Sequence, residues 1–204
     1  MRHFTFRIGV GALVAALALV PRVAAADVIT IDFESLKDGE EVVKQYLPDL
    51  VFTGATVLTA GISLNEVDFP PHSGVNVVYD IAGPMRVDFN PLRRASLFAG
   101  YFTYVAPLTL EAFNDAGKLL GSVSSLFKEN LGSGEHRPNE FLKLAFTDMA
   151  YVVITGDRAG GSFVLDDLSY ELGKEVPEPA TLALMLVGAV GMLRARRRVQ
   201  TRRG

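Results

Sequence analysis

Three acidic side chains lie close to the two ends of the region that the sequence predicts to fold. Glu34 follows the first predicted strand, and Asp166 and Asp167 lie inside the last one. If these two strands are neighbours in one sheet, the three carboxylates converge, and calcium binds to clustered carboxylate and carbonyl oxygens. We therefore predict a structural Ca²⁺ ion held by Glu34, Asp166 and Asp167. In the alternative, Asp166 and Asp167 occupy a β-bulge and bond backbone groups.

Side chains suited to nucleophilic catalysis are scarce. The chain contains no cysteine, and its only histidines beyond His3 are His72 and His136. Ser73 directly follows His72, but neighbours in sequence rarely meet as nucleophile and base. Neither histidine has partners at the spacing of zinc ligands. We therefore predict no catalytic residues and a protein that is not an enzyme. A glycoside or ester hydrolase is the alternative, because an acidic chain offers many carboxylate pairs.

The most distinctive polar stretch is residues 65–76, which read NEVDFPPHSGVN. It combines an aromatic residue, two prolines and several hydrogen-bonding side chains, which suits a loop that lines a ligand site. The candidate ligand residues are Asn65, Phe69, His72 and Asn76. The same composition also suits a rigid cover over one end of a β-structure, and we favour the cover.

Sugar binding uses aromatic rings for stacking and nearby polar groups for hydrogen bonds. The chain has no Trp, and several of its tyrosines lie in apolar predicted strands, where core positions are usual. The available rings are Tyr79, Tyr101, Tyr104 and Tyr151. We therefore expect no strong aromatic platform, and only a shallow polar site is left open.

Short strands must position all of these residues. Apolar and polar residues alternate in runs rich in β-branched and aromatic residues, separated by Gly, Pro and Asn turns. Asn114-Asp115-Ala116-Gly117 is a strong hairpin signal. Residues 41–46 are compatible with a helical turn or a bend. The predicted strands are 28–33, 50–53, 56–59, 75–80, 85–89, 96–104, 108–113, 118–124, 140–146, 151–155 and 162–170.

This pattern predicts an all-β domain at residues 27–173, an antiparallel β-sandwich of jelly-roll type. The first and last strands are expected in one sheet. The early sequence DFE at 32–34 and the late sequence LDDLSY at 165–170 resemble the ends of galactose-binding-like, carbohydrate-module sandwiches. The resemblance implies that a structural calcium lies between the terminal strands. It also implies that the domain binds carbohydrate.

The N-terminal 26 residues have the three parts of a secretory signal peptide. Arg2, His3 and Arg7 form a positive region, residues 8–20 are an apolar helix-forming stretch, and Ala24-Ala25-Ala26 supplies small residues for cleavage. We expect the mature chain to begin near Asp27. An uncleaved N-terminal anchor is the alternative.

Charge is distributed very unevenly along the chain. Residues 27–178 hold all 23 acidic residues but only 11 of the 20 Lys and Arg, a net charge of −12. Nucleic acids bind to cationic surfaces, so a nucleic-acid partner is not expected. The acidic region is compatible with cation binding and with solubility outside the cell.

Residues 174–204 divide into three parts. Pro177, Glu178 and Pro179 form a short motif within 176–179, residues 180–193 are an uncharged apolar segment, and residues 194–204 carry six arginines. A 14-residue helix spans about 21 Å, whereas a bilayer core is about 30 Å thick. The arginines place the C-terminal end in the cytoplasm by the positive-inside rule. We predict a short transmembrane helix that tethers the protein to the inner membrane, with a plain single-pass anchor as the alternative.

The order of motif, apolar segment and arginine cluster resembles the PEP-CTERM sorting signal of Gram-negative bacteria. The resemblance implies recognition by exosortase, a membrane-embedded protease, followed by delivery to the cell surface or extracellular matrix. The sequence thus predicts an exported β-sandwich protein that associates with extracellular polysaccharide. A non-catalytic structural matrix protein that makes protein or self contacts is the alternative.

Overall fold

The computed structural model describes residues 27–173, and this part of the chain contains only strands, turns and loops. All the strands pair antiparallel, which confirms the predicted all-β antiparallel fold. The predicted signal helix and transmembrane helix lie outside these residues. No helix within 27–173 has the length and apolar character needed to cross a bilayer. The twelve strands are β1 (Val28–Ile31), β2 (Glu41–Val42), β3 (Leu50–Thr53), β4 (Ala55–Thr59), β5 (Asn76–Asp80), β6 (Met85–Phe89), β7 (Ala95–Tyr104), β8 (Thr109–Phe113), β9 (Leu119–Ser124), β10 (Glu140–Leu144), β11 (Tyr151–Thr155) and β12 (Phe163–Leu172).

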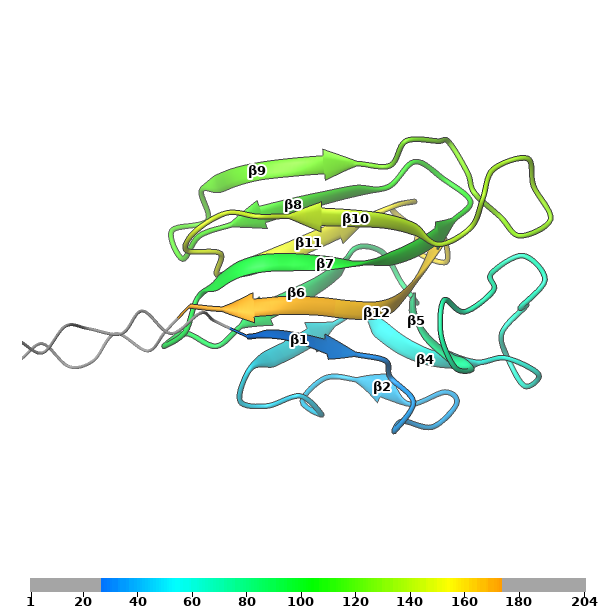
Figure 1. Cartoon of the computed structure of the whole chain (residues 1–204), viewed down its shortest axis with the longest axis horizontal. Helices are drawn as coiled ribbons and strands as arrows, with labels where there is room; N and C mark the ends of the chain where they lie inside the picture. The colour runs from blue at the N-terminus through cyan, green and yellow to red at the C-terminus, as the bar shows by residue number, and fades with distance from the viewer. Residues whose placement is uncertain (1–26, 174–204) are drawn as a thin grey trace, which may run out of the picture.

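The strands form two sheets, one of seven strands and one of five. The order in the larger sheet is β10-β7-β12-β5-β4-β2, with β1 paired to β12 beside this path, and the order in the smaller sheet is β3-β6-β11-β8-β9. The two sheets lie as layers in Figure 1. The jelly-roll connection pattern stays a prediction, whereas the two antiparallel sheets are observed.

Strand β12 shares one of its edges between two partners. Its first part pairs with β5 through Val164 and Leu165, and its last part pairs with β1 from Leu168 to Glu171. The opposite edge pairs with β7 along nearly its whole length. The expectation that the first and last strands share a sheet is therefore confirmed. Asp166 and Asp167 lie where β5 gives way to β1, and the register with β7 shifts there.

The hydrophobic core lies between the two sheets. Inward residues from both layers are almost completely buried, and they include Phe98 and Phe102 of β7, Phe163 of β12 and Val152 of β11. Their alternation with outward residues follows the two-residue period of a strand. Burying one such large apolar side chain contributes about 1.5–3 kcal/mol to folding. Packing of this core is what holds the outward side chains of each sheet in fixed places.

The hairpin between β8 and β9 forms where the sequence predicts it. The Asn114 side chain accepts hydrogen bonds from the backbone N–H groups of Ala116 and Lys118. Gly117 has a φ of 70°, which favours glycine. Residues 41–46, which the sequence leaves undecided, form the two-residue strand β2 followed by turns.

The two ends of the sandwich carry different parts of the chain, the outer ends of the terminal strands at one and the longest loops at the other. Val28 pairs with Glu171, so the first and last described strands begin and end at the same end of the molecule. The longest loops, residues 60–75 and 125–139, lie at the opposite end (Figure 1).

Candidate functional site

Loop 60–75 covers part of the outer face of the seven-stranded sheet, which we call the covered face. Leu64 of the loop packs on Val77 of β5 and Val164 of β12 in a small buried cluster. Phe69 and Leu58 pack against this cluster. Phe69 therefore holds the loop on the sheet, as a cover residue does.

The carboxylate of Asp166 fixes the end of this loop to β12. It is only 1% exposed, and its Oδ2 accepts hydrogen bonds from the backbone N–H groups of His72, at 2.7 Å, and Ser73, at 2.9 Å. Its Oδ1 accepts a third bond from the Asp167 N–H, at 2.7 Å. Burial raises the pKa of Asp166 to about 6, although the backbone N–H groups and their hydrogen bonds act in the opposite direction. Asp166 thus binds the loop from beneath.

Asp167 is turned toward the loop by a local irregularity in β12. Its φ is 45°, an unfavourable value for a non-glycine residue, and it lies at the register shift with β7. Its carboxylate contacts His72 Nδ1 at 2.6 Å and accepts a hydrogen bond from Ser73 Oγ at 2.8 Å. The strained backbone therefore places this carboxylate beside the imidazole.

Glu34 acts on the same loop from the end of β1. Its Oε1 accepts hydrogen bonds from the N–H groups of Val75 and Asn76, at 2.9 and 2.8 Å. The Asn76 side chain in turn donates to the carbonyls of Phe33 and Leu36. Asn76 is therefore a buried structural residue, because its amide ties β5 to the segment after β1.

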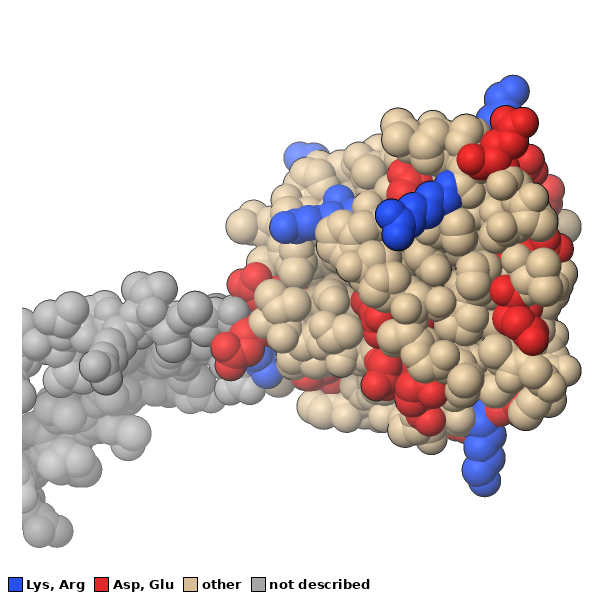
Figure 2. Space-filling model, turned by 45° about the vertical axis from the view of Figure 1, so that its right-hand side comes forward, with Lys and Arg blue, Asp and Glu red and all other residues tan. Residues whose placement is uncertain are grey.

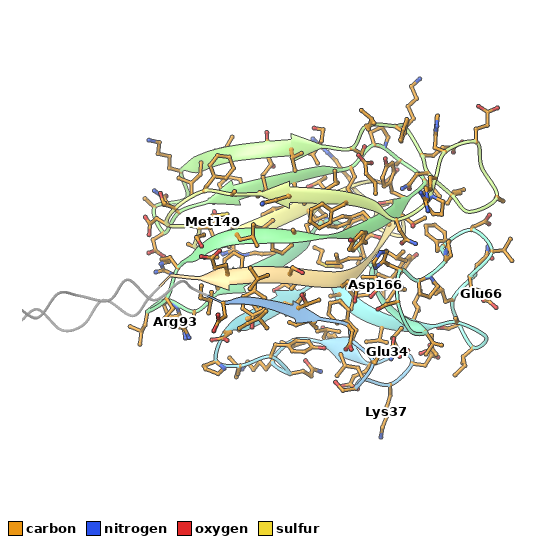
Figure 3. The ribbon with its side chains drawn as sticks, viewed as in Figure 1. Glu34, Lys37, Glu66, Arg93, Met149 and Asp166 are labelled. Atoms are coloured by element: carbon orange, nitrogen blue, oxygen red, sulfur yellow. The ribbon has the colours of Figure 1, made fainter. Side chains whose placement is uncertain are left out.

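The three predicted calcium ligands all bond residues 72–76. Glu34 and Asp166 are labelled in Figure 3, on neighbouring parts of the sheet. At the register shift, Asp166 bonds backbone N–H groups as in the alternative given above, whereas the Asp167 carboxylate contacts the side chains of His72 and Ser73. Within residues 27–173, no group of three or more His, Asp or Glu is arranged to hold a metal ion. As arranged, these residues do not form the clustered oxygen shell of a calcium site. Calcium binding stays a prediction for chelation experiments.

The tip of loop 60–75 is tied to loop 125–139. Asp68 bonds the Asn65 amide at 2.7 Å and also bonds the Ser133 hydroxyl. The Asn139 amide donates to the Pro70 carbonyl at 3.2 Å. Asn65 thus serves the internal structure of the loop. Unlike the buried Asn76 and the half-buried Phe69, the His72 side chain is 35% exposed.

His72 begins an aromatic row on the part of the covered face that the loop leaves open. Its ring stacks on Tyr101 at 3.4 Å between centroids, and Tyr101 contacts Phe141 at 5.1 Å. Tyr101 of β7 pairs directly with Phe141 of β10. Phe141 is 50% exposed. We call His72, Tyr101 and Phe141 the aromatic row.

The outer face of the five-stranded sheet, which we call the open face, is different. None of the outward side chains of its strands is buried. Arg86 of β6 donates to both carboxylate oxygens of Asp88, at 2.5 to 3.0 Å, and its guanidinium lies 3.6 Å from the centre of the Tyr151 ring. Tyr151 stacks on Phe113 with centroids 4.9 Å apart. These four residues form the Arg–Tyr strip, which crosses β6, β11 and β8.

Electrostatics stabilise this strip. Hydrogen bonding to Asp88 raises the pKa of the Arg86 guanidinium, so Arg86 stays charged over the whole physiological range. The side chains of Arg86 and Asp88 are 42% and 34% exposed, so both remain accessible to a ligand. A planar guanidinium and a carboxylate beside two aromatic rings can bind hydroxyl groups and apolar C–H groups together.

The sequence identified only part of these surfaces. Tyr101 and Tyr151 were candidates, whereas Tyr104 is buried in the core and Tyr79 packs at the small cluster under the loop. No motif in the sequence pointed to Arg86, Asp88, Phe113 or Phe141 as surface residues of a site. Arg86 and Asp88 are two residues apart on a predicted strand, which places them on one face and offers a usable signal.

The opposite end of the sandwich from the termini contains a shallow hollow of about 800 Å³. His136 lies beside it and stacks on Phe127 at 4.0 Å.

Acidic side chains are scattered over the surface seen in Figure 2, with fewer Lys and Arg among them. Residues 27–173 contain 21 Asp and Glu and 10 Lys and Arg.

The C-terminal segment is shown to be a sorting signal by comparison. Residues 175–198 match the PEP-CTERM protein-sorting motif. The predicted motif residues Pro177, Glu178 and Pro179 lie within this match. The chain is therefore an exported protein that carries a C-terminal sorting signal. Comparison with curated protein sequences finds no match.

Comparison with solved structures finds carbohydrate-binding modules and an adhesin domain among the chains similar to this one. The CBM22-1 xylan-binding domain from Paenibacillus barcinonensis Xyn10C is 14% identical, with a TM-score of 0.41, over 74% of this chain and 97% of that chain. A family 29 carbohydrate-binding module is 12% identical, with a TM-score of 0.39, over 73% and 93%. The K2 cleaved adhesin domain of Lys-gingipain is 13% identical, with a TM-score of 0.45, over 72% and 98%. At these identities the likeness concerns the fold alone.

Proposed function

We propose that this protein binds a neutral extracellular polysaccharide through the Arg–Tyr strip on the open face. The observation that carries the proposal is the accessible combination of Arg86, Asp88 and stacked aromatic rings on a face where no outward side chain is buried. Sugar rings present hydroxyl groups at their edges and C–H groups on their faces. The strip offers a matching partner for each.

Hydroxyl groups further along the same face support this assignment. Thr109 of β8 and Ser124 of β9 point outward and lie 3.3 Å apart. Hydroxyls of this kind exchange hydrogen bonds with sugars at little cost in desolvation. The open face therefore suits an extended, hydroxyl-rich chain better than a compact apolar ligand.

The charge of the domain supports a neutral ligand. With 21 acidic and 10 basic residues between 27 and 173, the domain repels polyanions at long range. The same charge argues against nucleic acid. Among polysaccharides, uncharged chains should therefore bind better than uronic-acid polymers.

The proposed path of the protein follows from its two ends. A signal peptide at residues 1–26 directs export, and residues 180–193 hold the chain in the inner membrane. An exosortase-type membrane protease then processes the segment around Pro177, and the domain reaches the cell surface or extracellular matrix of a Gram-negative bacterium. An apolar segment of marginal length is well suited to such a temporary tether.

Binding is tested with the purified full chain, against soluble glucan, xylan, mannan and galactan, with polygalacturonate as the acidic comparison. Replacing Arg86 and Tyr151 with Ala should weaken binding to the preferred neutral chain about tenfold or more, as expected for central contact residues. Ile62→Ala is the control, because this 74% exposed side chain lies in loop 60–75 over the other sheet. Unchanged affinity in the double variant would refute the open face as the binding site. If the wild-type protein binds none of the tested glycans, the alternative of a structural matrix protein is favoured.

The sorting assignment is tested in the producing cell. Replacing Pro177, Glu178 and Pro179 with Ala should leave full-length protein in the membrane fraction, which the intact mass of the mature chain would reveal. Continued processing of this variant would contradict the proposed role of the motif.

A further inference from the structure

The aromatic row on the covered face is not explained by the stability of the fold. Phe141 is the only Phe or Tyr among the exposed large apolar side chains of residues 27–173. It points outward from β10, while its neighbours Leu142 and Leu144 fill the core. An exposed aromatic ring beside two further rings is a feature of binding surfaces.

The row is rigid before any ligand arrives. The Tyr101 ring is in contact with both His72 and Phe141. The His72 ring is held by Asp167 at 2.6 Å, and its backbone N–H is held by buried Asp166. Little side-chain freedom remains to be lost on binding, which favours affinity. The strained φ of Asp167 thus has a consequence at the surface, because it orients the imidazole.

Polar side chains lie beside the aromatic row, at the next outward-facing position along the strands. Lys143 lies two residues after Phe141 on β10 and pairs with Ala99, which in turn pairs with Ser169. Ser169 and Thr30 share a hydrogen bond of 2.9 Å. Ala99, between Lys143 and Ser169, is only 1% exposed, so neighbouring side chains close over it and the polar groups form the surface there. An aromatic row next to hydroxyl and amino groups again matches the two kinds of surface on a sugar.

Other occupants of this surface fit less well. A stable protein partner buries about 800 Å² on each side around an apolar centre, but this row offers a single exposed aromatic ring. A polyanion is disfavoured by the excess of acidic residues. A neutral polysaccharide requires neither a broad apolar patch nor a cationic surface.

We infer that the aromatic row is a second polysaccharide-binding site, so that one domain holds two glycan chains on opposite faces. This inference rests on the proposed function of the open face and extends it. The Arg–Tyr strip and the row belong to different sheets, with the hydrophobic core between them. Face-to-face sheets lie about 10 Å apart, so a chain bound on one face does not reach the other face through the sandwich. The monomer is therefore a cross-linker of neutral polysaccharide.

The first experiment isolates the row. In the Arg86→Ala/Tyr151→Ala background, measurable binding to the preferred soluble neutral glycan should remain. Adding Tyr101→Ala and Phe141→Ala should weaken that residual binding about tenfold or more. Val28→Ala is the matched control, because this 55% exposed side chain also points outward from the same sheet and lies away from the row. Thermal melting of each variant verifies that it is folded.

The second experiment measures cross-linking. Wild-type protein should raise light scattering of the soluble glycan at intermediate protein-to-chain ratios, while size-exclusion chromatography shows whether it is monomeric. Variants of either face should bind without raising scattering. If the Arg86→Ala/Tyr151→Ala variant loses all binding while wild type binds, the proposed function stands and the second site is refuted. If wild type binds no glycan, the proposed function itself fails. Cross-linking that persists without Tyr101 and Phe141 would also overturn the inference.

Discussion

The two outer faces of the sandwich use carboxylates in opposite ways. Under loop 60–75, Asp166 is 1% exposed and accepts three backbone hydrogen bonds. On the open face, Asp88 is 34% exposed and pairs with Arg86. Both side chains point outward from a central strand of their sheet. The difference is whether a loop lies above, and it decides whether a charged group maintains the fold or stays available to a ligand.

On the covered face, some polar side chains stabilise the loop and one of them also orients the aromatic row. Asp166, Glu34 and Asn76 are committed to backbone groups of the loop and its neighbours. Asp167 lies at the boundary, because it holds His72, and His72 opens the aromatic row. Loop 60–75 therefore shields part of the sheet from solvent and, through His72, also positions the aromatic row on the part that stays open.

The largest expected effect tests the two carboxylates directly. Asp166→Ala leaves three N–H groups without their acceptor and should lower the free energy of unfolding by about 2–4 kcal/mol. Asp88→Ala removes an exposed ion pair and should cost less than about 1 kcal/mol. Urea unfolding of both variants and wild type measures the difference. Equal losses would mean that the loop does not distinguish the two faces.

The pH dependence of stability sharpens the same contrast. The pKa of Asp166 is about 6 in the folded protein, against an ordinary value of 3.8. Between these values the folded state binds the extra proton, so this contribution to the free energy of unfolding falls as pH rises from 4 to 6, and is constant above. Its size is at most about 3 kcal/mol, since one pKa unit corresponds to about 1.4 kcal/mol.

Urea unfolding from pH 4.5 to 7.5 in EDTA measures this effect as the difference between wild type and Asp166→Asn. The stability of wild type relative to the variant should decrease from pH 4.5 to about 6 and stay constant from there to pH 7.5. A difference that is constant with pH would show that Asp166 keeps an ordinary pKa beneath the loop.

The predicted calcium ion acts on the covered face alone. A chelator should then lower the melting temperature, and Asp166→Ala should erase that response. For free calcium at a hundred times the Kd, the expected stabilisation is about 2.7 kcal/mol. Differential scanning calorimetry with calcium and with EDTA measures it. Identical melting temperatures would remove calcium from the account of Glu34, Asp166 and Asp167.

The smallest effect concerns the apolar contact that holds the loop. Phe69 is half-buried against the small cluster, so Phe69→Ala should cost about 1–2 kcal/mol, less than a fully buried phenylalanine. Amide hydrogen exchange should increase in residues 61–70 and stay unchanged on the five-stranded sheet. Faster exchange on both sheets would show that the loop and the core unfold together.

Alternation of apolar and polar residues was sufficient to predict most of the strands. The β8–β9 hairpin follows from Asn114 and Gly117, and the pairing of β1 with β12 follows from the expectation that the sandwich closes with its terminal strands in one sheet. These features depend on local sequence or on a general rule of the architecture. The acidic residues at the junction were also identified, because Glu34 follows the first of those strands and Asp166 and Asp167 lie inside the last.

The binding surfaces were harder to predict, since they depend on long-range register. Tyr151 meets Phe113 only because β11 pairs with β8 at that register, and Tyr101 meets Phe141 for the same reason in the other sheet. A shift of one residue would turn each ring toward the core. No local pattern specifies these pairings, so the tyrosines were interpreted as core residues.

The position of β12 has a mechanical consequence. The strand ends at Leu172, and the N–H of Gly173 donates to the Arg94 carbonyl at 2.6 Å, only four residues before Pro177. Four residues span at most about 14 Å when fully extended. A pull on the sorting segment therefore reaches β12 directly and loads it lengthwise, in shear against β7 on one edge and β1 and β5 on the other. The inter-strand hydrogen bonds of β12 then share the load in parallel instead of breaking one at a time. The strand that leads to the sorting segment is therefore well placed to resist a pulling force.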